Sequence, residues 1–167
     1  MPGLFFPPRA WPPPLQLLYC RGMKLHIGTS GWSYASWKPS FFPQPLPSKR
    51  FLEFYATRLN AVELNATFRR MPTASAIAGW IGATPADFLF AAKVHQSITH
   101  FKRLKDADES MRFFLQSMEP MRQSGKLGPI LVQTPPNLKA RMLTDAARRT
   151  IDASRNGRAI SHWYCNR

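Results

Sequence analysis

The stretch "FLFAAKV", residues 88–94, decides the fold. It is a nearly continuous apolar run of strand length, and a run of this kind is typical of a strand buried on both faces, as in a parallel sheet. "PILV", inside 128–134, is a second such run. Both runs point to a parallel sheet.

The segments around this strand alternate in type. The predicted strands are 24–28, 61–68, 88–94 and 128–134, and the predicted helices are 49–59, 73–84, 108–125 and 142–154. Strands that alternate with helices of this length imply right-handed βαβ units. The predicted fold class is therefore α/β with parallel strands.

Length and composition predict one soluble domain. The chain has 167 residues, of which 44% are hydrophobic and 13% aromatic, as in a globular protein. No segment approaches the roughly 18 to 20 consecutive apolar residues of a membrane-spanning helix, so we expect no membrane partner. Cys20 and Cys165 lie outside the predicted folded body and form neither a disulfide framework nor a metal cluster. This agrees with a reducing, cytoplasmic setting.

Residues 1–22 contain two proline runs and lack the basic start and unbroken apolar segment of a secretory signal. We expect an unstructured extension here, with the domain beginning near Met23. A Pro-rich docking ligand and a start codon assigned too early are the alternatives.

The chain is strongly basic, with a net charge of +14. Two Arg in 1–22, and six Arg against two Asp in 141–167, leave +8 on residues 23–140. Such a charge attracts phosphates, nucleic acid and acidic surfaces without specifying one of them. Because the basic residues are scattered, an ordinary solvated surface is the alternative to a functional patch.

Candidate ligand-binding residues follow the first predicted strand, because ligands of parallel α/β folds bind where strands end. These candidates are Thr29, Ser30, Gly31 and Trp32. Glycine lets the backbone approach a bound group, hydroxyls and amides hold an anion or a sugar hydroxyl, and tryptophan stacks on a base or sugar. The alternative is a tight turn that needs Gly and Ser for conformational reasons alone.

The later strand ends supply polar candidates. Glu63 and Asn65 alternate with apolar residues, so the pattern sends both to one side of the second strand. Lys93 ends the third strand and would lie near Glu63 if the two strands are neighbours. We predict Glu63 as a general base or as the partner of Lys93, with a buried structural ion pair as the alternative. Gln133, at the end of the fourth strand, is predicted to hydrogen-bond a ligand.

His100 is a third catalytic candidate beside Glu63 and Lys93. His95 and His100 lie in a predicted loop without metal-ligand spacing, so we expect no metal site in this chain. No P-loop, GxGxxG or GxSxG motif occurs, which disfavours nucleotide-dependent phosphoryl transfer and serine-hydrolase chemistry. The sequence identifies no cofactor.

The connection "SYASWKPSFFPQPLPS", residues 33–48, is rich in proline and aromatic residues. Long connections in α/β domains are often functional. Two interpretations of Trp37, Phe41 and Phe42 remain: they belong to a lid over the site, or they form an aromatic plug that packs on the domain.

Six motifs together resemble the YecE-like family, the domain of unknown function numbered 72. They are "IGTSGWSY", "FYA", "VELNATF", the segment from Trp80 to "TPADFLFAAK", "ITHFKRL" and "LGPILVQTPP", which span residues 25 to about 138. The resemblance implies a TIM-type (β/α) barrel of bacterial cytoplasmic type whose activity is unsettled. Its fold would be similar to that of endonuclease IV and xylose isomerase.

The chain departs from the family in two places. Phe68, Arg69 and Arg70 stand where the family commonly has Phe-Tyr-Arg, so a cation replaces an aromatic residue; Arg70 remains a ligand-binding candidate. Residues 141–167 then read as a helix and a divergent basic tail, without a fifth strand. We therefore expect residues 23–140 to form the N-terminal half of a barrel, about four βα units, in a truncated or frame-shifted product.

Three functions stay open at this point. The first is a barrel enzyme acting on a phosphorylated or sugar-containing small molecule. The second is a nucleic-acid-binding or nuclease-like protein that uses Trp32, Trp37, Phe68 and the basic surface. The third is a non-functional fragment. Unpaired sheet edges also predict self-association.

Overall fold

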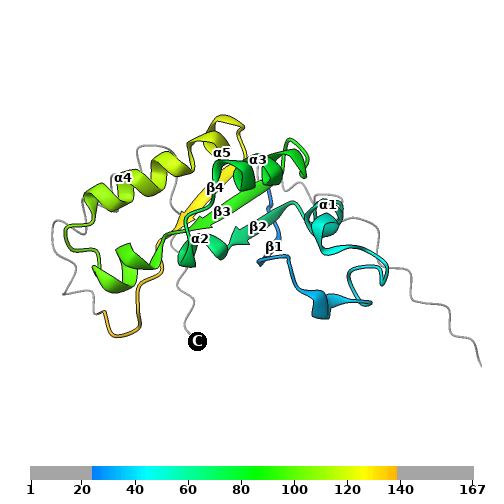
Figure 1. The fold of residues 1–167 in the computed structure, drawn as a ribbon, viewed down its shortest axis with the longest axis horizontal. Helices are drawn as coiled ribbons and strands as arrows, with labels where there is room; N and C mark the ends of the chain where they lie inside the picture. Colours follow the sequence, from blue (N-terminus) through cyan, green and yellow to red (C-terminus); the bar gives the residue numbers. More distant parts are fainter. Residues whose placement is uncertain (1–23, 139–167) are drawn as a thin grey trace, which may run out of the picture.

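A computed structural model describes residues 24–138 of the chain. Four strands form one sheet in the order β1-β2-β3-β4, and every neighbouring pair is parallel (Figure 1). The strands are β1 (Gly28–Ser30), β2 (Ala61–Leu64), β3 (Leu89–Lys93) and β4 (Leu127–Leu131). The predicted α/β fold with a parallel sheet is confirmed.

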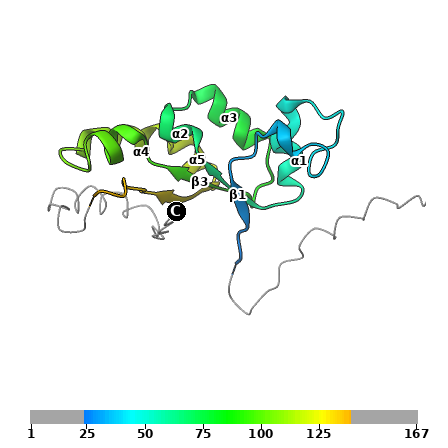
Figure 2. The ribbon, with the colours of Figure 1, turned by 90° about the horizontal axis from the view of Figure 1, so that it is seen from below.

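Helices connect the strands. They are α1 (Phe51–Ala56), α2 (Ala66–Arg69), α3 (Ala74–Gly82), α4 (Asp108–Ser117) and α5 (Glu119–Gln123), with 3-10 turns η1 (Ala35–Trp37) and η2 (Ser48–Arg50) and a π-helical turn η3 (Ser97–Phe101). Figure 2 shows these five α-helices on one side of the sheet.

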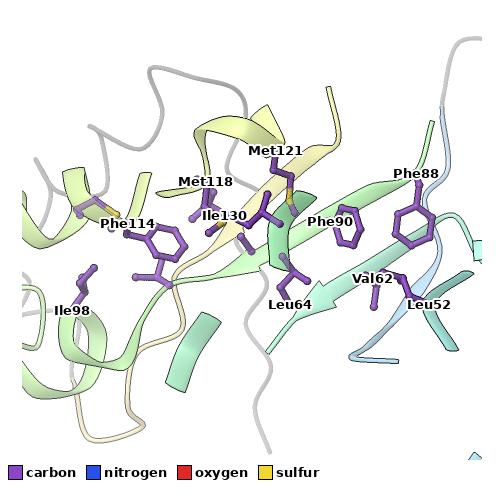
Figure 3. Packing of buried hydrophobic residues seen from close by; sticks show 14 of the residues in the cluster. Leu52, Val62, Leu64, Phe88, Phe90, Ile98, Phe114, Met118, Met121 and Ile130 are labelled. Carbon is purple, nitrogen blue, oxygen red and sulfur yellow. The ribbon is translucent and has the colours of Figure 1, made fainter. Parts of the chain in front are cut away.

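The two faces of the sheet therefore differ. On the face toward the helices, Val62, Leu64, Phe90, Ala92 and Ile130 are buried (Figure 3). They share a core with Phe114 of α4, Met121 of α5 and Met118, the residue between these two helices. The alternate strand positions are only partly buried or exposed, and we call them the open face: Ser30, Ala61, Glu63, Leu89, Ala91 and Lys93. The sequence predicted strands that are buried on both faces. Within residues 24–138, only the face toward the helices is buried.

The first strand lies later than the predicted segment 24–28, which was wrong except at Gly28. The side chain of Asn60 holds the residues before it: its Oδ1 accepts from Ile27 N (2.8 Å) and its Nδ2 donates to Leu25 O (3.0 Å). The Asn60 amide thus supplements the backbone hydrogen bond there, from Ala61 N to Ile27 O (3.2 Å). Gly28 itself is needed for close approach, because a Cβ at this position would lie 1.9 Å from Ala61 O.

The second strand ends at Leu64, and the predicted strand over 65–68 is wrong because α2 begins at Ala66. The buried hydroxyl of Thr67 lies 2.6 Å from both Leu64 O and Lys93 O. It shares its proton between carbonyls at the ends of two neighbouring strands, which fixes the turn out of β2. Asn65 has helical backbone angles at this turn.

The predicted helix 108–125 is two helices, α4 and α5, that meet at Met118. Pro120 lies in the first turn of α5, and proline has no N–H with which to continue the hydrogen-bond ladder of α4. Gly125 follows the end of α5, where its φ of +75° suits glycine.

The aromatic residues of the connection 33–48 pack on α1. Phe42 is fully buried and stacks on Phe51, with ring centroids 4.0 Å apart, and Trp37 lies against both Phe41 and Phe42. This packing favours the aromatic plug over the lid.

Several predicted features lie outside the described residues. They are the extension 1–22, the helix 142–154 and the basic tail within 141–167. Within residues 24–138, no helix is long and apolar enough to cross a membrane.

Candidate functional site

The strand ends bring Glu63 and Lys93 to one edge of the sheet. In the register of the sheet, Ser30 pairs with Glu63 and Glu63 pairs with Ala91. Lys93 is two residues beyond Ala91 and therefore shares the same face. The carboxyl ends of all four strands meet at this edge, as parallel pairing requires.

Glu63 and Lys93 form an ion pair on the open face. Lys93 Nζ lies 4.0 Å from Glu63 Oε1, and the two side chains are 16% and 26% exposed, respectively. The predicted neighbourhood of the two residues is confirmed. At this distance and exposure the carboxylate and the ammonium both remain accessible from the open face.

Two rings complete this group. Lys93 Nζ lies 4.9 Å from the centroid of the Phe68 ring, and the His100 ring meets Phe68 edge-on, with centroids 5.0 Å apart. Phe68 comes from α2 and His100 from η3, so two connections converge on the ends of β2 and β3. We call Glu63, Phe68, Lys93 and His100 the edge cluster.

The surroundings of His100 favour its uncharged form. Burial, and to a lesser degree the charge of Lys93, lowers the pKa of His100 below its ordinary value near 6.5. His100 Nδ1 lies 2.9 Å from Oγ1 of the buried Thr99, which orients the ring. A neutral imidazole held in this way can accept or donate a proton.

Ser30 and Asn65 lie beside one another at the same edge. Asn65 Nδ2 donates a hydrogen bond to Ser30 Oγ, and Ser30 is the register partner of Glu63. Arg70 follows α2 and is exposed, and Gln133 lies two residues beyond β4 and is partly buried. Within residues 24–138, neither the Arg70 nor the Gln133 side chain has a hydrogen-bond partner.

Other predicted ligand-binding residues contact the protein itself. Thr29 points toward the helices, where its N donates to Tyr55 Oη (2.8 Å), and its Oγ1 donates to Gly31 O (2.7 Å). Gly31 adopts a φ of +83° and forms a turn. The Trp32 ring meets Trp80 of α3 edge-on, with centroids 5.9 Å apart. These contacts favour the tight-turn alternative for Thr29 and Gly31 and give Trp32 a packing role.

His95 links two elements near the cluster. Its Nδ1 accepts from Ser97 N (3.1 Å), and its Nε2 lies 3.3 Å from Arg69 O. His95 thereby joins η3 to the end of α2. Among residues 24–138, no three His, Cys, Asp or Glu side chains gather in a group that could hold a metal ion.

The sequence did not predict that Phe68 contacts Lys93 and His100, or that Thr99 contacts His100. Phe68 was proposed only as a stacking residue for nucleic acid, and its predicted strand position gave no reason to place it beside Lys93. The only signal was the motif "NATF" directly after a strand that carries a glutamate.

Comparisons with known proteins agree on one family. A family model described as "Protein of unknown function DUF72" matches residues 26–157. The UPF0759 protein YunF of Bacillus subtilis (strain 168) is 30% identical over 116 residues, which cover 67% of this chain and 40% of YunF. The UPF0759 protein YecE of Escherichia coli (strain K12) is 29% identical over 119 residues, covering 71% of this chain and 40% of YecE. This chain thus matches well under half the length of these relatives.

Two solved structures share the fold. A DUF72 family protein from Thermotoga maritima has a TM-score of 0.65 and 30% identity, over 77% of this chain and 51% of that protein. A DUF72 family protein from Enterococcus faecalis V583 has a TM-score of 0.61 and 24% identity, over 77% of this chain and 46% of that protein. Because the Enterococcus faecalis protein is only 24% identical to this chain, the comparison with it supports the fold and nothing more.

Proposed function

Since this chain belongs to the DUF72 family of proteins of unknown function, we propose its function from the geometry of the strand ends. The edge cluster and its polar neighbours bind a small phosphorylated or sugar-containing molecule and move a proton on it. Glu63 is the base, Lys93 stabilises negative charge that develops on the ligand, and neutral His100 holds or relays a proton.

The position of the Glu63–Lys93 ion pair is the main observation in support of this proposed function. Charged groups that face an apolar sheet cost free energy unless they are paired or serve a function. The two charged atoms of this pair lie 4.0 Å apart, longer than a hydrogen bond, which is not the close geometry that makes a largely buried ion pair stabilising. It also lies at the edge of a parallel sheet where α/β folds bind ligands.

A TIM-type barrel is part of the proposal. The parallel order of the four strands, with helices on one face, supports it, because in such a barrel the open face lines the interior and the active site lies at the carboxyl ends of the strands. The matched relatives are longer than the matched segment, so the activity of a whole protein includes groups beyond those described here. A bacterial cytoplasmic setting, which the resemblance implies, belongs to the same proposal.

The proposed proton transfer uses the two charges in different ways. The Glu63 carboxylate would accept a proton from a carbon or hydroxyl of the ligand. The Lys93 ammonium would stabilise the resulting negative charge at a neighbouring oxygen, and its contact with Phe68 orients it for this task. The Glu63 carboxyl formed in this step would return the proton, and His100 could relay it by taking a proton at one ring nitrogen as it releases one from the other, so that the ring is uncharged before and after the transfer.

Nucleic-acid binding is the alternative, and the aromatic contacts count against it. Trp32 packs on Trp80, Trp37 packs on Phe42, and Phe68 lies between Lys93 and His100. Each of the three rings is thus engaged by a neighbouring side chain, whereas single-strand binders stack bases on exposed aromatic side chains. Binding to generic duplex or single-stranded DNA that weakens steeply with salt would revive this alternative.

Ligand-observed NMR tests the proposal on the full chain. Saturation transfer is measured for ribose, glucose, ribose 5-phosphate and glucose 6-phosphate with the wild type, Glu63→Gln, Lys93→Met and the control Glu109→Gln, an exposed carboxylate on α4. We expect signals for the wild type and the control, and loss of signal for Lys93→Met. In D2O, Glu63→Gln should lose any solvent-deuterium incorporation that the wild type catalyses. Absence of binding by the wild type, or equal binding by all four proteins, would contradict the proposal.

A further inference from the structure

Basic residues are distributed unequally between the two ends of the sheet. The connections that leave β2 and β3 at the carboxyl edge, residues 65–73 and 94–107, hold five cations against Asp106: Arg69, Arg70, Lys102, Arg103 and Lys105. The connections at the amino edge, residues 57–60, 83–88 and 124–126, hold Arg58 and Lys126 against Asp87. An anion is therefore attracted to the edge that carries the edge cluster.

The cluster itself carries balanced charge. The ammonium of Lys93 faces the carboxylate of Glu63 and the ring of Phe68, and the lowered pKa of His100 favours its uncharged form. A phosphate dianion placed directly on this pair would meet the negative carboxylate as well as the ammonium. The cluster and the adjacent Ser30 and Asn65 instead offer alternating donors and acceptors, which suit hydroxyl groups.

The cationic side chains around the edge cluster differ in whether they already form hydrogen bonds within the protein. Lys102 Nζ donates to Asp106 O and Ser110 Oγ, and Arg103 Nη2 donates to Asn137. Arg69 and Arg70 are exposed, and their guanidinium groups have no hydrogen-bond partner within residues 24–138. Arg69 is the last residue of α2, the short helix that begins after Asn65, and Arg70 follows it. A guanidinium left free at a ligand edge is suited to bidentate binding of phosphate.

We infer that the ligand has two chemically different ends: an uncharged hydroxyl-bearing end on the edge cluster with Ser30 and Asn65, and a phosphate on Arg69 and Arg70. This inference rests on the proposed function and specifies the substrate class as a sugar phosphate or a similar phosphorylated polyol. The proton-transfer chemistry then takes place at the hydroxyl-bearing end, remote from the phosphate.

Calorimetric titration of the full chain with ribose 5-phosphate, ribose and inorganic phosphate tests the inference. Ribose 5-phosphate should bind at least tenfold more tightly than either of its parts. Arg69→Gln with Arg70→Gln should lower the affinity for ribose 5-phosphate about tenfold and leave the affinity for ribose unchanged. Asn65→Ala should weaken both sugars and not phosphate.

The matched control is Arg58→Gln, which removes a positive charge at the amino edge, where Arg58 lies over the Phe54 ring. It should leave the affinity for ribose 5-phosphate within twofold of the wild type, and thermal unfolding checks that every variant is folded. Equal affinity for ribose and ribose 5-phosphate, or an equal loss in the control, would overturn the inference while the proposed function stands. Absence of binding by all three probes would contradict both.

Discussion

Lys93 Nζ lies 4.0 Å from Glu63 Oε1 across two neighbouring parallel strands, and the same ammonium lies 4.9 Å from the centre of the Phe68 ring. The ammonium is thus held between a carboxylate and a π face at the point where β2 and β3 end. Because both charged side chains remain partly exposed, water screens their attraction. This arrangement favours a role in ligand binding over a role in stability.

A double-mutant cycle on this pair measures its contribution to stability. For Glu63→Gln, Lys93→Met and the double variant, the coupling free energy of unfolding in urea should be below about 1 kcal/mol, as for partly exposed ion pairs. A coupling of about 3 kcal/mol or more would be that of a buried structural ion pair and would contradict the binding role.

The lowered pKa of His100 predicts a specific pH dependence of stability. Since burial and then Lys93 place the folded-state pKa below the unfolded value of about 6.5, the unfolded chain binds a proton first as the pH falls. This contribution is therefore fully present above the unfolded pKa and is lost as the pH falls from there toward the folded pKa. His100→Gln should lose less stability than the wild type between pH 7 and pH 5 in urea unfolding. Identical slopes for His100→Gln and the wild type would refute the assignment.

Lys126 stabilises the end of α3. Its Nζ donates to Ile81 O (2.6 Å), Thr84 O (2.6 Å) and Thr84 Oγ1 (3.0 Å), and the residue is 6% exposed. Burial lowers the pKa of Lys126, while Asp87 opposes the shift. Lys126→Met should leave these carbonyls without a donor and cost about 2 kcal/mol in the free energy of unfolding. The exposed control Lys105→Met should change it by less than about 0.5 kcal/mol; equal effects would show that the contacts of Lys126 add no stability.

Tyr55 joins β1 to β2 from α1. Its buried hydroxyl accepts from Thr29 N (2.8 Å) and donates to Ala61 O (3.0 Å), and burial raises the pKa of this phenol. Tyr55→Phe should destabilise the protein by about 1 to 2 kcal/mol, because it removes a partner from two backbone groups. Tyr34→Phe removes a hydroxyl that binds the exposed Ser30 O and should cost less. A larger loss for Tyr34→Phe would reverse this assignment.

The sequence predicted the sheet because its strongest signals are local. The apolar run at 88–94 contains β3, the run at 128–134 includes all of β4 except Leu127, and the predicted helices 49–59 and 73–84 contain α1 and α3. The boundaries of β1 and β2 were wrong because distant groups determine them. Asn60 holds the residues before β1, and Thr67 reaches Lys93 O on the next strand. Neither contact leaves a periodic pattern in the sequence.

The same distinction applies to the site. The proximity of Glu63 and Lys93 follows from parallel register, so it could be predicted from strand ends alone. The packing of Trp32 on Trp80, and of Phe68 between Lys93 and His100, depends on how connections fold back over the sheet. Residue types alone did not distinguish an aromatic side chain that packs on the protein from one that binds a ligand.

Amide chemical-shift mapping tests the central claim most directly. Ribose 5-phosphate is titrated into the isotopically labelled full chain while the backbone amide spectrum is recorded. The account predicts that the largest shifts occur at the carboxyl edge, at Ser30, Asn65, Arg70, Lys93 and His100, and that Lys93→Met abolishes them. Shifts concentrated at the amino edge, around Arg58 and Asp87, or an unchanged spectrum at saturating ligand, would contradict a binding site at the strand ends.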